Sequence, residues 1–129
     1  MRWPERLTAQ HDTSQFRNAK HLALDEWLQK RALANDGLSS RTYVVCPEDA
    51  PMRVVGYYAL SATKEQRGAL PSAKLRQGMP DEVPFILIGR LAVDAAYQGR
   101  GLGSALLRDS LTRCLTISEV IGARAVVTH

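Results

Sequence analysis

The residues best suited to chemistry in this sequence form the short run QGRGLG at residues 98–103. Glycine stands at every second position, and an apolar run typical of a helix follows. Glycines let a backbone turn sharply and approach a bulky ligand, while successive N–H groups and the first turn of a helix attract anions. Arg100 adds a positive charge at the rim. The run therefore predicts a site for a phosphate or a pyrophosphate.

Three known kinds of phosphate loop compete for this run. A P-loop needs a lysine directly before Ser104, where the sequence has Gly103. A dinucleotide-binding loop has the spacing GxGxxG and an acidic residue about 20 positions on, at the end of the next strand. Here the spacing is GxGxG, and Glu119 falls at the end of the expected helix. Both of these loops fit the sequence poorly.

The third kind of loop binds acetyl-CoA in a known family. The run RLAVDAAYQGRGLGSALL resembles the central motif of the GNAT N-acetyltransferase superfamily, Gln/Arg-x-x-Gly-x-Gly/Ala at a turn from strand to helix. The resemblance implies acetyl-CoA as the cofactor. Its pyrophosphate is expected on Gln98, Gly99, Arg100, Gly101, Leu102, Gly103 and Ser104. Main-chain groups of Leu91, Ala92 and Val93 are expected to bind the pantetheine arm and polarise the thioester carbonyl.

A narrower resemblance runs from about Leu24 to His129. The segments LDEWLQKRAL, SRTYVV, VVGYYALS, MPDEVPFILIGRLAVD and ARAVVTH look like the toxin branch of the superfamily. This implies an enzyme of a bacterial toxin–antitoxin module that acetylates the free amine of aminoacyl-tRNA and blocks translation, with a ribbon-helix-helix antitoxin as partner. Two alternatives stay open: a GNAT enzyme for another amine, and a chain that binds cofactor and antitoxin without turnover.

The sequence departs from the family pattern at its C-terminal end. A complete member continues with a further helix and two strands, and that helix carries the tyrosine thought to protonate the leaving thiolate. The sequence therefore predicts a single domain over residues 1–129, a GNAT fold truncated after its fifth strand, with no catalytic residue to assign. The last strand would be an unpaired apolar edge, which tends to recruit another chain. This predicts a homodimer or another partner at that edge.

Basic residues supply a second set of candidates. Between residues 63 and 78, four cations accompany a single acid, Glu65. A solvated loop is the default interpretation, and contacts to tRNA phosphates are the alternative. The candidates for such contacts are Lys64, Arg67, Lys74 and Arg76, with Lys30 and Arg31 of the first helix. Arg90, a charge within an apolar strand, is either an exposed-face residue or a functional one.

Periodicity predicts the elements of the first half. The run ERLTA predicts a short strand at residues 5–9. Residues 12–37 predict a helix, broken near residues 19–21. Its apolar side carries Leu24, Trp27, Leu28 and Ala32. Residues 41–46 and 53–62 are rich in β-branched and aromatic residues and predict a hairpin.

The second half predicts a long loop at residues 63–82, a buried strand at 83–93 and a strand at 123–128. Between the strands, residues 102–118 predict a helix, and Tyr97 is expected to pack over the turn before it. The predicted buried stripe of that helix is Leu107, Leu111, Cys114, Leu115 and Ser118. The order predicts an α/β fold with a mixed, mostly antiparallel sheet flanked by helices.

Composition limits the class of protein, its partners and its location. With 129 residues, 45% of them hydrophobic and 23% charged, the chain is an ordinary globular domain, and its net charge of +4 permits a polyanionic partner. No apolar run approaches the ~20 residues that span a bilayer, and the start MRWPERLTAQHD lacks the apolar core of an export signal. A cytoplasmic protein is expected. Cys46 and Cys114 predict two buried free thiols and no metal site.

Overall fold

A computed structural model of the chain describes residues 1–66, 82–121 and 124–127. The described residues form one five-stranded sheet in the order β1-β2-β3-β4-β5. Neighbouring strands are antiparallel from β1 to β4, and β5 runs parallel to β4. The strands are β1 (Glu5–Arg6), β2 (Arg41–Val45), β3 (Gly56–Gln66), β4 (Glu82–Val93) and β5 (Arg124–Val127). The predicted mixed, mostly antiparallel sheet is confirmed.

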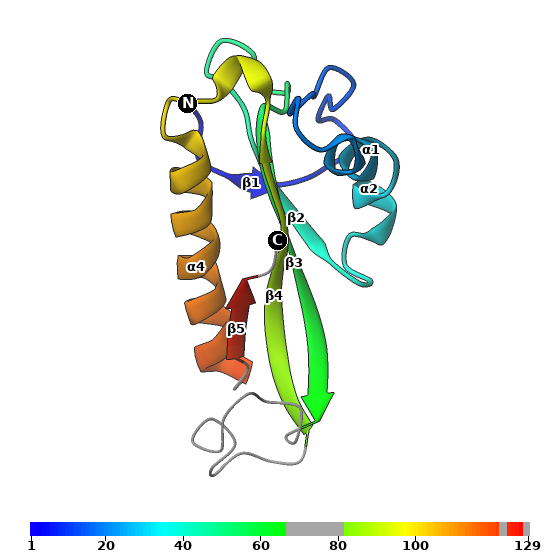
Figure 1. Cartoon of the computed structure of the whole chain (residues 1–129), viewed down its shortest axis with the longest axis vertical. Helices are drawn as coiled ribbons and strands as arrows, with labels where there is room; N and C mark the ends of the chain where they lie inside the picture. The colour runs from blue at the N-terminus through cyan, green and yellow to red at the C-terminus, as the bar shows by residue number, and fades with distance from the viewer. Residues whose placement is uncertain (67–81, 122–123, 128–129) are drawn as a thin grey trace.

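Helices cover both faces of this sheet (Figure 1). One face carries α1 (Leu22–Lys30) and α2 (Ala32–Asn35), and the other carries α4 (Leu102–Ile121). A short 3-10 turn, η2 (Ala95–Tyr97), follows β4. Alternate residues of the hairpin supply two cores: Val44 and Tyr57 pack with α1, while Tyr43 and Tyr58 pack with α4. The expected α/β class with helices flanking the sheet is therefore confirmed.

The first helix begins later than the sequence predicts. Residues 12–20 form turns and irregular backbone, and α1 starts at Leu22. The cause is Asn18, whose Oδ1 accepts hydrogen bonds from the backbone N–H groups of Lys20 and His21 at 2.9 and 2.8 Å. Such local bonds compete with helical ones, and Ala19 takes a left-handed φ of 70°. The predicted apolar side is correct: Trp27, Leu28 and Ala32 are buried, with Leu24 packed against the same core.

The predicted buried stripe of α4 is largely wrong. Its leucines, Leu107, Leu111 and Leu115, are 37%, 39% and 62% exposed. The row that packs on the sheet is Leu106, Ser110 and Cys114, and the side chain of Ser118 lies outside the described set. Close packing selects this row, because a Cβ added to Gly56 would stand 2.9 Å from Leu106 Cδ1. Gly56 thus lets the helix approach the strand at that residue.

The central strands extend into the segment predicted as a loop. β3 continues to Gln66 and β4 already begins at Glu82, so Lys64 belongs to a strand. Cross-strand pairing runs to the Gln66↔Glu82 pair, and these ladder hydrogen bonds order a polar stretch that has no strand periodicity of its own. The hairpin is confirmed, although its second strand starts at Gly56 instead of residue 53. Predicted residues Arg67, Lys74 and Arg76 lie outside the described residues.

One irregularity in β4 decides which side chains reach which face. Ala59 pairs with Arg90, but the next residue, Leu60, pairs with Ile88, so Gly89 is the extra residue of a β-bulge. An extra residue reverses the alternation of side chains along a strand. Ile88 before the bulge and Leu91 after it therefore both pack toward α4, whereas Arg90 faces α1.

Candidate functional site

The QGRGLG run forms the predicted tight turn between β4 and α4 (Figure 1). Gly99 and Gly101 have left-handed φ angles of 77° and 79°, which other residues adopt only at a cost. The first hydrogen bond of the helix runs from the Ala105 N–H to the Gly101 carbonyl at 3.0 Å. Across the described part of the chain, no acceptor is bonded to the backbone N–H groups of residues 99–104. These donors and the positive end of the α4 dipole form an anion site.

Gln98 braces the turn with its side chain. The Nε2 atom donates to the Asn18 carbonyl at 2.7 Å and to the Val93 carbonyl at 2.8 Å, which uses both of its hydrogens. The backbone N–H of Gln98 donates to the Ala95 carbonyl at 3.5 Å. Gln98 is predicted from the sequence as a pyrophosphate ligand, and both hydrogens of its side-chain amide are used by the Asn18 and Val93 carbonyls.

Tyr97 packs over the turn, as predicted. Its ring lies under the guanidinium of Arg100, 5.0 Å from the ring centroid, and Arg53 lies 5.9 Å from the same ring. Asp94 stabilises the start of the turn, because its side chain accepts hydrogen bonds from the N–H groups of Ala96 and Arg17 at 2.9 and 3.1 Å. Arg100 is thus held beside the free amides, where its charge adds to theirs.

The end of β4 presents main-chain groups next to the turn. Among the described residues, β5 pairs with β4 along four residues, from Phe85 to Ile88. The Asp94 N–H donates to the Val55 carbonyl, toward β3, at 2.8 Å. Because main-chain groups alternate along a strand, the N–H groups of Leu91 and Val93 point the other way, toward the open edge. The same alternation turns the main-chain N–H of Ala92 toward β3.

A cavity of about 290 Å³ joins this strand edge to the turn. Its walls are Asn18, Lys20, His21, Leu24, Leu91, Ala92, Val93, Gln98, Gly99 and Gly103. Four predicted residues lie outside its walls: Arg100 on Tyr97, Gly101 in the turn, Leu102 against the α4-side core, and Ser104 exposed on the helix. A Cβ added to Gly99 or Gly101 would meet no atom within 4 Å, so the space over both glycines is open. These residues fit acetyl-CoA, with amides for the pyrophosphate and a strand edge for the pantetheine arm.

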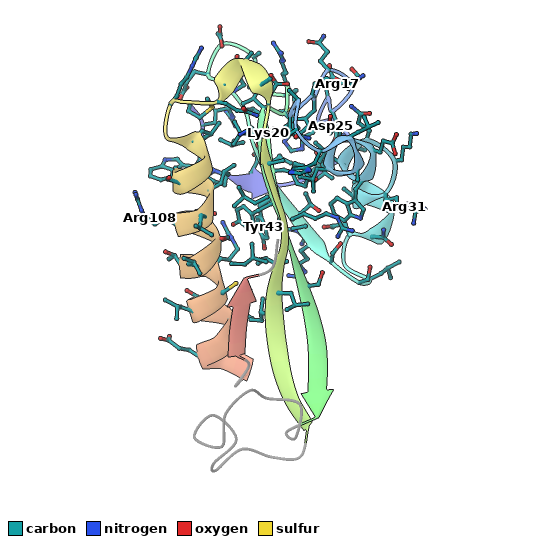
Figure 2. The ribbon with its side chains drawn as sticks, viewed as in Figure 1. Arg17, Lys20, Asp25, Arg31, Tyr43 and Arg108 are labelled. Atoms are coloured by element: carbon teal, nitrogen blue, oxygen red, sulfur yellow. The ribbon has the colours of Figure 1, made fainter. Side chains whose placement is uncertain are left out.

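The sequence does not predict the part of the cavity wall that comes from the segment before α1. Asn18, Lys20 and His21 precede α1, and Figure 2 shows Lys20 beside the end of β4. The sequence predicts a break in the helix near residues 19–21, but it does not show that this break faces the cofactor turn. The signal that could have found them is Asn18 itself, a residue type that bonds to the backbone of a turn. Lys20 brings a positive charge to the wall of an anion site.

A second cavity, of about 800 Å³, lies between α1 and the bulged part of β4. Its walls are Ala23, Leu24, Glu26, Trp27, Lys30, Arg31, Ser61, Leu87, Gly89 and Arg90. The structure therefore brings the predicted pair Lys30 and Arg31 to the same cavity as Arg90, with Glu26 as the one acid among these walls. Lys64 lies in β3, and its side chain is outside the described set.

The tyrosines of the early strands are engaged in the core. The Tyr57 hydroxyl donates to the Leu24 carbonyl at 2.7 Å, and the Tyr58 hydroxyl donates to Asp109 on α4. Burial raises the pKa of both phenols well above the usual value, and for Tyr58 the hydrogen bond to Asp109 adds to the effect. Both hydroxyls are therefore engaged in hydrogen bonds within the protein.

Glu5, His11 and Cys46 place possible metal-binding atoms within 4.8 Å of one another. The Thr8 N–H donates to His11 Nδ1 at 2.9 Å, so Nδ1 is an acceptor and Nε2 carries the proton that points at Glu5, 3.1 Å away. Burial raises the pKa of the Cys46 thiol to about 11. With the metal-facing nitrogen protonated and the thiol neutral, the cluster is explained by its hydrogen bonds. Both cysteines are free and buried, as the sequence predicts.

Comparison with known proteins identifies relatives of this arrangement. The profile of the Acetyltransferase (GNAT) family matches residues 5–125. A tRNA-acetylating toxin of Mycobacterium tuberculosis (strain ATCC 25618 / H37Rv) is 44% identical over 127 residues, which are 98% of this chain and 74% of that protein. No helix of the described residues is long and apolar enough to cross a membrane.

Two solved structures share the fold closely. AtaT complexed with acetyl-methionyl-tRNAfMet is 27% identical, with a TM-score of 0.85 over 98% of this chain and 77% of that one. A mutant AtaT toxin bound to the C-terminus of the antitoxin AtaR and acetyl-CoA is 26% identical, with a TM-score of 0.76 over 97% of this chain and 73% of that one. The predicted resemblance and fold class are confirmed by these matches.

Proposed function

This chain belongs to the GNAT family of acetyltransferases, and from that membership we propose that it transfers the acetyl group of acetyl-CoA to the α-amine of aminoacyl-tRNA. Blocked aminoacyl-tRNA cannot serve in elongation, so the protein would act as a toxin that stops translation. One observation carries the proposal: free amides of residues 99–104 stand beside an open strand edge at Leu91 and Val93. A pyrophosphate and a thioester need donors placed in this way.

Different groups of the chain bind different parts of acetyl-CoA. The amides of the turn, with the α4 dipole, Arg100 and Lys20, bind the pyrophosphate. The N–H groups of Leu91 and Val93 orient the pantetheine arm, and the Leu91 N–H polarises the acetyl carbonyl as negative charge develops on its oxygen. Bound acetyl-CoA supplies an activated acyl group as a thioester. Gln98 holds the turn and the strand end in register through its bonds to Asn18 and Val93.

The acceptor side is the 800 Å³ cavity between α1 and β4. Lys30, Arg31 and Arg90 give it a positive wall, which suits the phosphates of a tRNA. Four more basic residues are further candidates for tRNA contacts: Lys64, Arg67, Lys74 and Arg76. The AtaT relative complexed with acetyl-methionyl-tRNAfMet supports an RNA acceptor for this fold.

The proposal extends to partners. A ribbon-helix-helix antitoxin and a second copy of the chain are the proposed protein partners, and the cytoplasm, where charged tRNA is found, is the proposed location. The AtaT relative bound to the C-terminus of the antitoxin AtaR supports an antitoxin of some kind. Light scattering of the purified chain, alone and with the co-purified antitoxin, tests both partners.

Transfer of labelled acetyl groups tests the function directly. The chain is incubated with labelled acetyl-CoA and bulk bacterial tRNA that is either charged or deacylated. We expect label on charged tRNA alone, and its loss when mild base hydrolyses the aminoacyl ester. Label on small amines or on peptide N-termini in place of tRNA would identify a GNAT enzyme for another acceptor. Binding of CoA without transfer to any of these would identify a chain that binds its ligands without turnover.

A further inference from the structure

Arg90 stands at the point where the two cavities meet along β4. The bulge at Gly89 turns its side chain toward α1 and the acceptor cavity, whereas the next residue, Leu91, presents its main-chain N–H to the cofactor cavity. Successive residues of a strand are about 3.3 Å apart. Arg90 and the main-chain N–H of Leu91 are therefore adjacent along β4, one at each cavity.

The guanidinium of Arg90 is held in place by an aromatic column. It lies over the ring of Trp27, 4.3 Å from the centroid. Trp27 is itself buried and stacks on Tyr57 at 6.0 Å with an interplanar angle of 15°. Phe16 packs edge-on against Tyr57, and the centroids of the two rings are 5.6 Å apart. The side chain of Arg90 is therefore already ordered, and it loses little conformational entropy when a ligand binds, which favours tight binding.

Arg90 lacks an anionic partner in the described residues. Glu26 lines the same cavity, but no ion pair joins a described carboxylate to Arg90, and no described protein acceptor is bonded to its N–H groups. The buried carboxylate nearest in sequence to Trp27 is Asp25, whose Oδ1 already accepts two hydrogen bonds from Asn18. A half-buried guanidinium with free donors is costly unless an anion completes it. The stack covers one face of the planar group, and its edge stays available for a bidentate acceptor.

We propose that Arg90 binds the last phosphodiester of the RNA acceptor, the 5′-phosphate of the terminal nucleotide whose ribose carries the aminoacyl ester. This inference rests on the proposed function, because it takes aminoacyl-tRNA as the substrate. That phosphate is the anion of the substrate nearest to the reacting amine. Phosphate geometry matches the arginine fork, and Lys30 and Arg31 extend the positive wall toward the preceding nucleotides. Arg90 thereby positions the amine against the acetyl group held at Leu91.

The test compares an acceptor that carries that phosphate, together with the rest of the RNA, with an acceptor that has no phosphate at all. The first is the charged tRNA that the wild-type chain acetylates fastest, and the second is the 3′-aminoacyl ester of adenosine with the same amino acid. For Arg90→Met, we expect kcat/KM to fall about 10- to 100-fold on the charged tRNA and to stay unchanged on the adenosine ester. Arg90→Lys keeps the charge without the fork and is expected to lie between. An equal loss on both acceptors, or no loss on either, overturns the proposal.

Binding gives a readout that needs no transfer. A fluorescent CCA-ended RNA minihelix is titrated with each variant at rising salt. Arg90→Met is expected to reduce the slope of log K against log salt by about 0.7, the value of one phosphate contact on single-stranded RNA. The control is Arg108→Met, an exposed arginine on the outer side of α4 (Figure 2). CoA affinity should match the wild type in every variant, which shows that the fold is intact.

The outcomes of the two proposals are distinguishable. If the wild-type chain acetylates no charged tRNA, the proposed function fails, and minihelix binding alone then decides the role of Arg90. If the wild type does not bind the minihelix, or if Arg90→Met binds it with the wild-type salt slope, Arg90 is not a phosphate ligand. If charged tRNA is acetylated and Arg90→Met behaves like Arg108→Met, the function stands and the inference about Arg90 is overturned.

Discussion

The substitution Gly101→Ala separates the fold of the turn from its role as an anion site. Gly101 has a φ of 79°, and a Cβ there would meet no atom within 4 Å, so the expected cost is backbone strain without a clash. Left-handed backbone costs a non-glycine residue about 1–2 kcal/mol. For a domain of this size, that lowers Tm by roughly 3 to 8 °C.

The chain contains a matched control. Gly37, after α2, has the same φ of 79° and the same open surroundings. Gly37→Ala is therefore expected to lose as much stability as Gly101→Ala. Only Gly101→Ala disturbs the amides that we propose as ligands of the pyrophosphate. A charged hydrogen bond is worth about 1.5–3 kcal/mol, so losing one weakens CoA binding about 10- to 100-fold.

Calorimetric titration with CoA and thermal unfolding of both variants measure the two effects. We expect equal losses of Tm and a loss of CoA affinity confined to Gly101→Ala. Added CoA should also raise the Tm of Gly37→Ala as much as that of the wild type, because ligand stabilisation follows the free-ligand concentration divided by Kd. If both variants bind CoA with wild-type affinity while both lose stability, the amides of the turn do not carry the pyrophosphate and the reasoning fails.

Three further substitutions test the surroundings. Gln98→Leu removes two hydrogen bonds and should cost about 2 kcal/mol in urea unfolding; an unchanged unfolding midpoint would contradict the bracing role. Gly103→Ala should raise stability by about 0.5–1 kcal/mol, since its Cβ would stand 3.7 Å from Val93 Cγ2 and alanine favours the helix; a loss would reveal a clash that the structure lacks. Burial raises the pKa of Cys46 from 9.0 to about 11, which favours the folded state below pH 9. Stability should therefore fall between about pH 9 and pH 11, by at most about 1.4 kcal/mol per unit, and Cys46→Ala should flatten that fall.

The donor half of the site follows from local sequence. The turn at residues 98–104 is defined by glycines whose conformation and position before a helix depend on near neighbours. The hairpin and the strand before the turn are likewise marked by β-branched and aromatic runs. Local signals of this kind predict an anion site and a strand leading to it. They identify what the site can bind because one contiguous segment supplies both the turn and the strand.

Contacts between distant segments could not be predicted in this way. The segment before α1 reaches the cofactor cavity through Asn18, whose carbonyl accepts from Gln98 across eighty positions of sequence. The rotation of α4 depends on close packing at Gly56, and the helix sequence offers two apolar rows with no means of choosing between them. Such choices are made by packing, which periodicity alone does not encode.

The bulge at Gly89 joins the two halves of the site. The run VPFILIGRLAV is apolar almost throughout, so it has no alternation of polar and apolar residues. The sequence therefore does not show on which face of the sheet the side chain of Arg90 lies. With regular pairing, Arg90 would share the face of Ile88, inside the core under α4. One extra residue reverses that facing and sets Arg90 on Trp27, at the wall of the acceptor cavity, while Leu91 stays at the cofactor edge. The proposed acceptor and donor sides are therefore placed on adjacent residues, Arg90 and Leu91, by a single glycine. A substitution that straightened β4 would be expected to damage RNA binding and acetyl transfer together while leaving the pyrophosphate turn intact.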